Sequence, residues 1–171
     1  MLFNTIEFVI FFVFVLGVLV TIKNKKFHHL FLLGVSYFFL YYTNNYLITL
    51  LIFSTLLDYF IGNQIWKAKI LSRKKILLAL SIAGNLSLLG YFKYTDFAIT
   101  EFNELFRTVG LGEIPLLEIA LPVGISFYTF QSLSYTIDIY RGKLEPSKSL
   151  GEFALFVAFF PSLVAGPILR A

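Results

Sequence analysis

The sequence predicts an all-α protein, a polytopic transmembrane bundle of about six spans with one amphipathic helix at the membrane interface. Hydrophobic residues make up 58% of the 171 residues and charged residues only 14%, so a soluble domain of this composition would expose too much apolar surface. Apolar runs long enough for membrane helices recur along the chain. Lysine and arginine gather between these runs, as they do in the cytoplasmic loops of membrane proteins.

The first apolar run, Phe3 to Ile22, is expected to be a retained transmembrane helix. A cleavable signal peptide opens with positive charge and ends at small residues, and this run does neither. Lys23, Lys25 and Lys26 follow directly. Under the positive-inside rule this connection is cytoplasmic, which places the N-terminus outside.

Two further runs, LFLLGVSYFFLYY and NYLITLLIFSTLLDYFIGNQI, are separated by Thr43-Asn44-Asn45 and are expected to form a tight helical hairpin. The densest basic cluster of the chain, Lys67 to Lys75, comes next. Its charge also indicates a cytoplasmic loop, which fits two crossings since the first basic connection. The run from Ile76 to Phe92 then carries the chain outward again.

The segment from Lys93 to Glu118 is rich in acidic residues and poor in Lys and Arg, which agrees with the outer face. Apolar residues recur there at helical spacing opposite charged ones, so we expect an amphipathic helix at the interface. Asp96 is the expected N-cap of this helix and Gly110 its expected end.

The segment LPVGISFYTFQSLSYTIDIYRG, residues 121–142, is expected to return inward as a helix with an irregular entrance at Pro122 and Gly124. Polar positions recur along one face of this helix, flanked by Thr129, Ser132 and Thr136. The face consists of Gly124, Tyr128, Gln131, Tyr135 and Asp138. Because buried polar groups without partners are costly, this stripe should face other helices or a hydrated cavity, and interhelical hydrogen bonding alone is an open alternative.

The last apolar run begins near Phe153 and is interrupted by Pro161 and by Gly166-Pro167. Such breaks occur in membrane helices where protein or a water-filled cavity satisfies the freed backbone groups. We therefore expect a broken helix here.

Three other ionisable residues are candidates. Asp58 is either a functional intramembrane carboxylate or a partner of the Lys67 to Lys75 cluster at the membrane edge, and its position in the span favours the pairing. His28 and His29 are expected to be solvated at the interface, because no enclosed site or converging partner is visible around them.

Several chemistries lack sequence support. There are no cysteines, no Gly-rich phosphate loop, no His-x-x-x-His pattern and no Gly-x-Ser-x-Gly elbow. We expect no metal site and no resident cofactor. The basic residues are explained as cytoplasmic loops, so nucleic-acid binding is not expected.

Three stretches in order, LGYFKYTDFAITEFNELF, LPVGISFYTFQSLSYTIDIYRG and FFPSLVAGPILRA, resemble the membrane-bound O-acyltransferase family, in its bacterial branch of alginate O-acetylation and D-alanyl teichoic acid transfer proteins. SYFFLYY and STLLDYFIG also resemble that branch, so the similarity covers essentially the whole chain.

The resemblance implies transfer of an acyl group, typically acetyl, from a donor to hydroxyls of an exopolysaccharide or cell-wall polymer, at a passage through a ring of helices in the cell (inner) membrane. It suggests that Tyr128, Gln131, Tyr135 and Asp138 line or brace this passage, with Arg141 near its cytoplasmic mouth. The family's catalytic histidine lies in a later segment with no counterpart here, so the catalytic residue is unknown.

The resemblance also implies that residues 1–171 are the N-terminal part of one transmembrane domain of a longer protein. Alone, this part is expected to be inactive in acyl transfer. Its partners would be the lipid bilayer, the acyl donor, the polysaccharide acceptor, and the missing C-terminal part or other polysaccharide-modification proteins. The competing class is a non-catalytic membrane scaffold or transport component whose polar stripe only holds helices together.

Overall fold

The computed structural model describes residues 5–165, and these form helices joined by short or extended connections. The helical elements, in chain order, are α1 (Ile6–Thr21), α2 (Lys25–Asn44), the 3-10 helix η1 (Asn45–Leu47), α3 (Ile48–Lys67), α4 (Leu71–Val109), α5 (Ile125–Tyr140), α6 (Leu150–Ala158) and α7 (Phe160–Ala165). The described part of the chain contains no strand, which confirms the expected all-α class.

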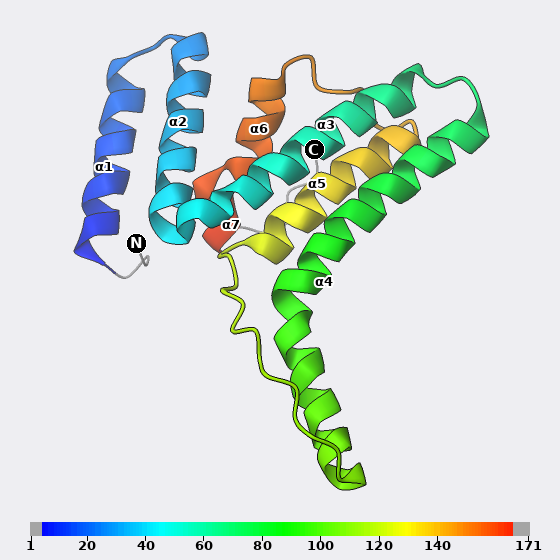
Figure 1. Ribbon diagram of the computed structural model, residues 1–171. Coiled ribbons are helices and arrows are strands. Elements are labelled where there is room, and N and C mark those ends of the chain that lie inside the picture. Colours follow the sequence, from blue (N-terminus) through cyan, green and yellow to red (C-terminus); the bar gives the residue numbers. More distant parts are fainter. Residues whose placement is uncertain (1–4, 166–171) are drawn as a thin grey trace.

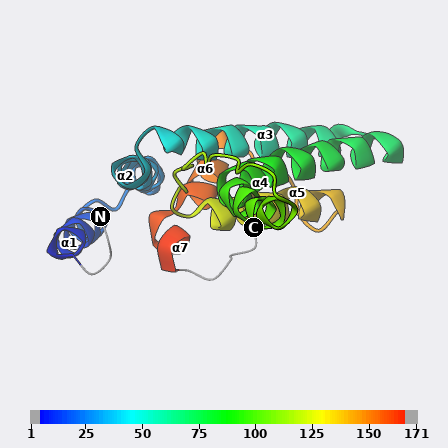
Figure 2. The ribbon, with the colours of Figure 1, turned by 60° about the horizontal axis from the view of Figure 1, so that its bottom comes forward.

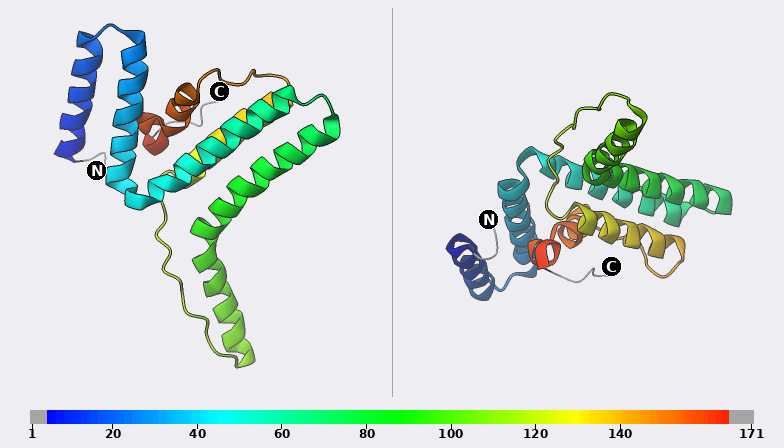
Figure 3. Two further views of the ribbon diagram at one scale, coloured as in Figure 1. Left: turned by 45° about the horizontal axis from the view of Figure 1, so that its top comes forward. Right: turned by 90° about the horizontal axis from the view of Figure 1, so that it is seen from below.

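The centre of the molecule is formed by α3, α4 and α5, which pack against one another (Figure 1, Figure 2). α6 packs against α2, α3 and α5, and α7 against α2. α1 lies at the edge beside α2 (Figure 3). Its contacts include aromatic rings, with Phe11 stacked 5.8 Å from Phe39 and edge-on at 5.4 Å to Phe160.

Two helices are long and apolar enough to cross a membrane: Asn45–Lys67, with 23 residues, and Leu71–Val109, with 39, at mean hydropathies of 1.4 and 1.5. The segments Ile6–Thr21 and Leu150–Leu163 are shorter apolar helices. Most large side chains on the outer face of α1 are apolar and exposed, as expected for contact with lipid rather than water. These are features of a helical membrane protein.

Several helices begin where the sequence supplies a capping side chain. The Asn24 side chain accepts a hydrogen bond from the Lys26 amide at 3.0 Å, and the Ser149 hydroxyl accepts one from the Gly151 amide at 3.2 Å. Each satisfies a backbone donor that the first helical turn leaves without a partner. Gly110 ends α4 in a left-handed conformation with φ of 75°, which confirms the expected stop.

The expected boundary inside α4 is wrong. α4 runs without interruption from Leu71 to Val109, so Asp96 lies within a helix and caps none. No glycine or proline lies between Phe92 and Asp96 to break the helix. The Asp96 carboxylate instead accepts hydrogen bonds from the amides of Leu117, at 3.0 Å, and Ile119, at 2.7 Å, and holds the returning connection against α4.

The connection between α2 and α3 is as short as expected, but the two helices do not form a tight hairpin. α3 turns away from α2 beyond η1 and packs mainly against α4 and α5 (Figure 1). Asn45 has a positive φ of 52° at the corner, a conformation that Asn tolerates better than most residues.

Gly62 permits the close approach of α3 and α5. A Cβ added there would lie 2.9 Å from both the Tyr135 ring and the Ile139 side chain, closer than such atoms pack. We expect Gly62→Ala to lower the melting temperature in detergent by roughly 5 °C, because the two helices must move apart. Gly17→Ala is the matched control, since a Cβ at Gly17 meets nothing within 4 Å. Equal melting temperatures for the two variants would contradict this account.

Candidate functional site

A carboxylate lies at the centre of the three packed helices. Asp58 of α3 is 0% exposed. It accepts hydrogen bonds from the Ser81 hydroxyl of α4 at 2.5 Å and from the Asn85 side-chain amide of α4 at 2.8 Å. The Ser132 hydroxyl of α5 donates a third. One side chain therefore links α3, α4 and α5.

Asn85 extends this cluster and uses its hydrogen-bonding groups fully. Its amide nitrogen donates to Asp58 and also to the Ser81 backbone carbonyl at 3.0 Å. Its amide oxygen accepts from the Ser54 hydroxyl at 2.5 Å. We call Ser54, Asp58, Ser81, Asn85 and Ser132 the Asp58 cluster; all five are buried. Because every donor in the cluster has an acceptor, its burial avoids the cost of unmade hydrogen bonds.

The expected pairing of Asp58 with the Lys67 to Lys75 cluster is wrong. Along the helix axis Asp58 lies roughly 13 Å from Lys67, and its carboxylate points into the helix contact instead of toward the membrane edge. Its role as an intramembrane carboxylate stays a prediction.

The partners of Asp58 had a signal in the sequence. Ser54 and Asp58 are four residues apart, as are Ser81 and Asn85, so each pair lies on one helix face. Two polar faces in neighbouring apolar helices indicate a contact between them.

The break between α6 and α7 is satisfied by side chains from other helices. Pro161 has no N–H and cannot continue the hydrogen-bonding pattern of α6. The Phe156 carbonyl, which would pair with the Phe160 amide in a continuous helix, accepts from the Gln131 side-chain amide of α5 at 2.8 Å. The Phe160 amide donates to the Ser36 hydroxyl of α2 at 3.4 Å. This confirms the interruption at Pro161, while Gly166-Pro167 lies outside the described residues.

The entrance to α5 has the irregular geometry expected from its sequence. Gly124 is the N-cap residue and has a φ of 83°, in the left-handed region where residues with a Cβ are strained. Its missing Cβ would also lie 3.5 Å from the Leu163 carbonyl, so α5 begins close to α7. Pro122 is buried directly before this turn.

The predicted polar stripe of α5 is buried along most of its length. Tyr128, Gln131 and Tyr135 are all buried, whereas Asp138 is half-buried and Arg141, the C-cap residue, is exposed. Sequence reasoning placed Ser132 only beside the stripe, yet Ser132 is the residue that reaches Asp58. α5 therefore presents two polar sides, one toward α3 and α4 and the other toward α6.

Two atoms of the stripe have no hydrogen-bond partner in the part of the chain that the structure describes: the Tyr128 hydroxyl and the side-chain oxygen of Gln131. Tyr128 is 2% exposed and Gln131 0%. One of these atoms can donate a hydrogen bond and the other can accept one. Leaving each unpaired costs about 1–3 kcal/mol, so they are the positions on α5 at which a further polar partner would be most stabilising.

Tyr135 holds the connection that follows α5. Its hydroxyl accepts a hydrogen bond from the Ser147 amide at 3.1 Å, and its ring lies 4.1 Å from that of Phe153. It also lines a cavity of about 240 Å³ under this connection, with Glu145 and Glu152 among the other lining residues. Two positions of the predicted stripe therefore line cavities in the described structure: Tyr135 lines this one, and Gly124 lines another at the start of α5.

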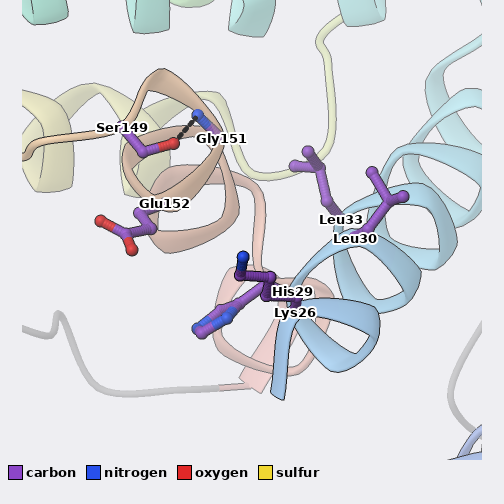
Figure 4. Close-up of a pocket in the computed structure, with 7 residues that line it drawn as sticks. All are labelled: Lys26, His29, Leu30, Leu33, Ser149, Gly151 and Glu152. Atoms are coloured by element: carbon purple, nitrogen blue, oxygen red, sulfur yellow. Dashed lines mark hydrogen bonds between the residues drawn. The ribbon is translucent and has the colours of Figure 1, made fainter. Parts of the chain in front are cut away.

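A second cavity, also of about 240 Å³, lies between the first turns of α2 and α6 (Figure 4). Lys26 and His29 line it from α2, and Ser149 and Glu152 from α6. Glu152 is more than a hundred residues from His29 along the chain, so no local sequence pattern placed the two at one cavity. His29 is exposed, in agreement with the expectation from the sequence. His28 instead contacts the Ile22 backbone carbonyl.

No group of three or more histidine or acidic side chains able to hold a metal ion occurs in residues 5–165.

The fold and the site together define a class of protein: a helical membrane protein whose central helices enclose a hydrogen-bonded carboxylate. Beside these helices lies a broken helix whose free backbone groups bind side chains of other helices.

Comparison with curated proteins identifies the relatives of this chain. It is 39% identical over 171 residues to the probable alginate O-acetylase AlgI of Pseudomonas aeruginosa, covering 99% of this chain and 33% of the relative. It is 38% identical to the protein of the same name from Pseudomonas putida over 150 residues, covering 87% of this chain and 31% of that one. Its identity to the peptidoglycan O-acetyltransferase of Helicobacter pylori is 34%, covering 86% of this chain and 32% of that enzyme.

These similarities agree with the resemblance to the membrane-bound O-acyltransferase family, because the matched relatives are named alginate O-acetylase and peptidoglycan O-acetyltransferase. It spans about a third of the length of the curated relatives it matches. No family model matches the chain, and no solved structure does.

Proposed function

We propose that this chain forms part of a membrane-bound O-acyltransferase that transfers acetyl, or another acyl group, to hydroxyls of an exopolysaccharide such as alginate or of a cell-wall polymer. The observation that carries the proposal is the 39% identity to an alginate O-acetylase over 99% of the chain. The acyl donor is a substrate rather than a resident cofactor. The residues that perform the transfer belong to the remaining two thirds of such an enzyme.

The proposed topology has about six spans in the inner membrane and the N-terminus outside. The connections before α2, between α3 and α4, and between α5 and α6 lie toward the same end of the molecule (Figure 1). These connections and their flanks carry basic residues, among them Lys23, Lys69 and Arg141. The opposite end, where α4 stops, carries Glu101 and Glu113. This distribution supports a cytoplasmic face at the basic end.

Within this enzyme, Tyr128, Gln131, Tyr135 and Asp138 would line or brace the passage between donor and acceptor, with Arg141 at its cytoplasmic mouth. The unpaired Tyr128 hydroxyl and Gln131 oxygen support this role, because buried polar atoms normally have partners. A polar substrate, water or a later helix of the full enzyme would supply them.

The alternative is a non-catalytic scaffold or transport component. It is favoured by the Asp58 cluster, whose members satisfy one another and need no ligand. Under this alternative the polar groups serve helix packing alone.

A chimera tests the proposal. The first third of the Pseudomonas aeruginosa alginate O-acetylase would be replaced by this chain in a strain lacking the native gene, and O-acetyl groups on secreted alginate would be measured. We expect the chimera to restore acetylation, because the chain aligns with that enzyme over 99% of its own length. This chain alone and the remaining two thirds alone are both expected to give none.

The outcomes separate the two functions. A chimera that inserts in the membrane at normal abundance but leaves alginate without acetyl groups would favour the scaffold. Acetylation of a polysaccharide by the purified 171-residue chain without a second polypeptide would show that the remaining two thirds are dispensable, contrary to the proposal.

A further inference from the structure

The cavity between α2 and α6, of about 240 Å³, has a polar end and an apolar end (Figure 4). Lys26 and His29 lie on the first turns of α2, opposite Ser149 and Glu152 at the start of α6. Leu30 and Leu33 line the same cavity further along α2 (Figure 4). Both helices begin at the basic end of the molecule, so in the proposed topology the charged groups lie at headgroup depth and the leucines deeper.

An apolar groove continues from this cavity. Leu30 also lines a space of about 380 Å³ between α1 and α2, and it is 71% exposed. The groove is lined by Phe11, Phe14, Leu30, Phe31, Gly34, Val35 and Phe38. Gly34 leaves room in it, because a Cβ there would meet nothing within 4 Å. Its apolar lining, contributed by both α1 and α2, suits a hydrocarbon chain.

The charges at the polar end are mixed. Lys26 and His29 offer N–H donors, and Glu152 offers a carboxylate, yet Lys26 and Glu152 form no ion pair with each other in the described structure. A ligand carrying only negative charge would be repelled by Glu152, and one carrying only positive charge by Lys26. A headgroup with both charges close together complements both sides.

We propose that this cavity binds a phospholipid with a primary ammonium in its headgroup, such as phosphatidylethanolamine. Its phosphate lies against Lys26 and His29, its ammonium donates hydrogen bonds to Glu152, and one acyl chain crosses Leu30 into the groove between α1 and α2. A choline headgroup fits less well, because its quaternary nitrogen has no N–H to donate. A glycerol headgroup lacks the positive charge.

Lipid competition tests the site. The 171-residue chain would be reconstituted in nanodiscs containing equal amounts of phosphatidylethanolamine, phosphatidylcholine and phosphatidylglycerol with identical acyl chains. After brief exchange into detergent, the lipids retained per protein would be counted by mass spectrometry. We expect phosphatidylethanolamine to be enriched about fivefold over each of the others, the size of effect expected for screened charge contacts. Equal retention of the three lipids would overturn the proposal.

Variants that remove single charges test which side chain binds which part of the headgroup. Glu152→Gln should abolish the preference over phosphatidylcholine and shift retention toward phosphatidylglycerol. Lys26→Gln should lower retention of all three lipids. Glu101→Gln and Lys75→Gln, which remove exposed charges outside the cavity, should change nothing. An unchanged lipid preference in Glu152→Gln would contradict the assigned orientation.

The acyl chain has its own test. Gly34→Leu would fill the groove, so it should lower retention of all three lipids without changing their ratio. Soluble phosphoethanolamine should not displace the bound lipid at millimolar concentration. If it did, the cavity would recognise a small soluble ligand instead. None of these outcomes depends on acyl transfer, so the lipid site and the proposed function can fail separately.

Discussion

Asp58→Ala is expected to lower the melting temperature of the chain in detergent by roughly 10 °C. The substitution leaves the Ser81 hydroxyl, the Asn85 amide and the Ser132 hydroxyl buried without their acceptor. Unmade buried hydrogen bonds cost about 1–3 kcal/mol each, and together they correspond to a loss of this size in a protein of similar length. The cavity left by the carboxyl group adds to the loss.

Asp58→Asn is the conservative variant and should lose less than half as much. Its amide oxygen accepts as before, and serine hydroxyls can rotate to accept from its amide nitrogen. Glu101→Ala removes an exposed carboxylate and should change the free energy of unfolding by less than about 0.5 kcal/mol. If Asp58→Ala melted at the same temperature as Glu101→Ala, the cluster would not hold the three helices together.

The second large effect is expected on activity. In the alginate O-acetylase chimera, Gln131→Leu and Asp138→Leu should each lower acetylation by about tenfold, equivalent to ~1.4 kcal/mol of transition-state stabilisation, if they line the passage. Membrane insertion should be unaffected. Acetyl content of the polymer and the amount of protein in the membrane are the two measurements.

Stability distinguishes the two residues. Gln131 caps the Phe156 carbonyl at the end of α6, so Gln131→Leu should also lower the melting temperature. Asp138 is half-buried with no side-chain hydrogen bond in the described structure, so Asp138→Leu should leave the melting temperature unchanged. Full activity of Asp138→Leu would mean that this end of the stripe is dispensable. Phe130→Leu, on an exposed face of α5, is the control and should alter neither property.

Local signals in the sequence located several helix ends. Gly110 and Gly124 adopt the left-handed conformation expected of them, and Pro161 interrupts the last apolar run. The boundary expected at Asp96 was wrong, because a residue type that caps helices also occurs within them when its side chain has another partner. Here that partner is the returning connection at Leu117 and Ile119, which no local pattern reveals.

In the candidate site, too, local spacing was predicted from the sequence, whereas contacts between distant residues were not. Helical spacing placed Tyr128, Gln131 and Tyr135 on one side of α5, and all three are buried together. The expected pairing of Asp58 was wrong because one of its actual partners, Ser132, lies 74 residues away along the chain. The sequence showed a carboxylate near a basic loop, and charge attraction was the nearest available explanation.

By itself, the sequence determined that this is an all-helical membrane protein related to O-acetylating enzymes. The hydrophobic composition, the helical spacing of apolar residues and the sequence motifs are properties of the chain alone, so they need no tertiary structure to be seen. Only the tertiary structure decided which polar groups meet: Asp58 with Ser132, and Gln131 with the Phe156 carbonyl. It also decided that His29 and Glu152 line one cavity. Hydrogen bonds act over about 3 Å, so these partnerships depend on how separate helices pack and not on distance along the chain.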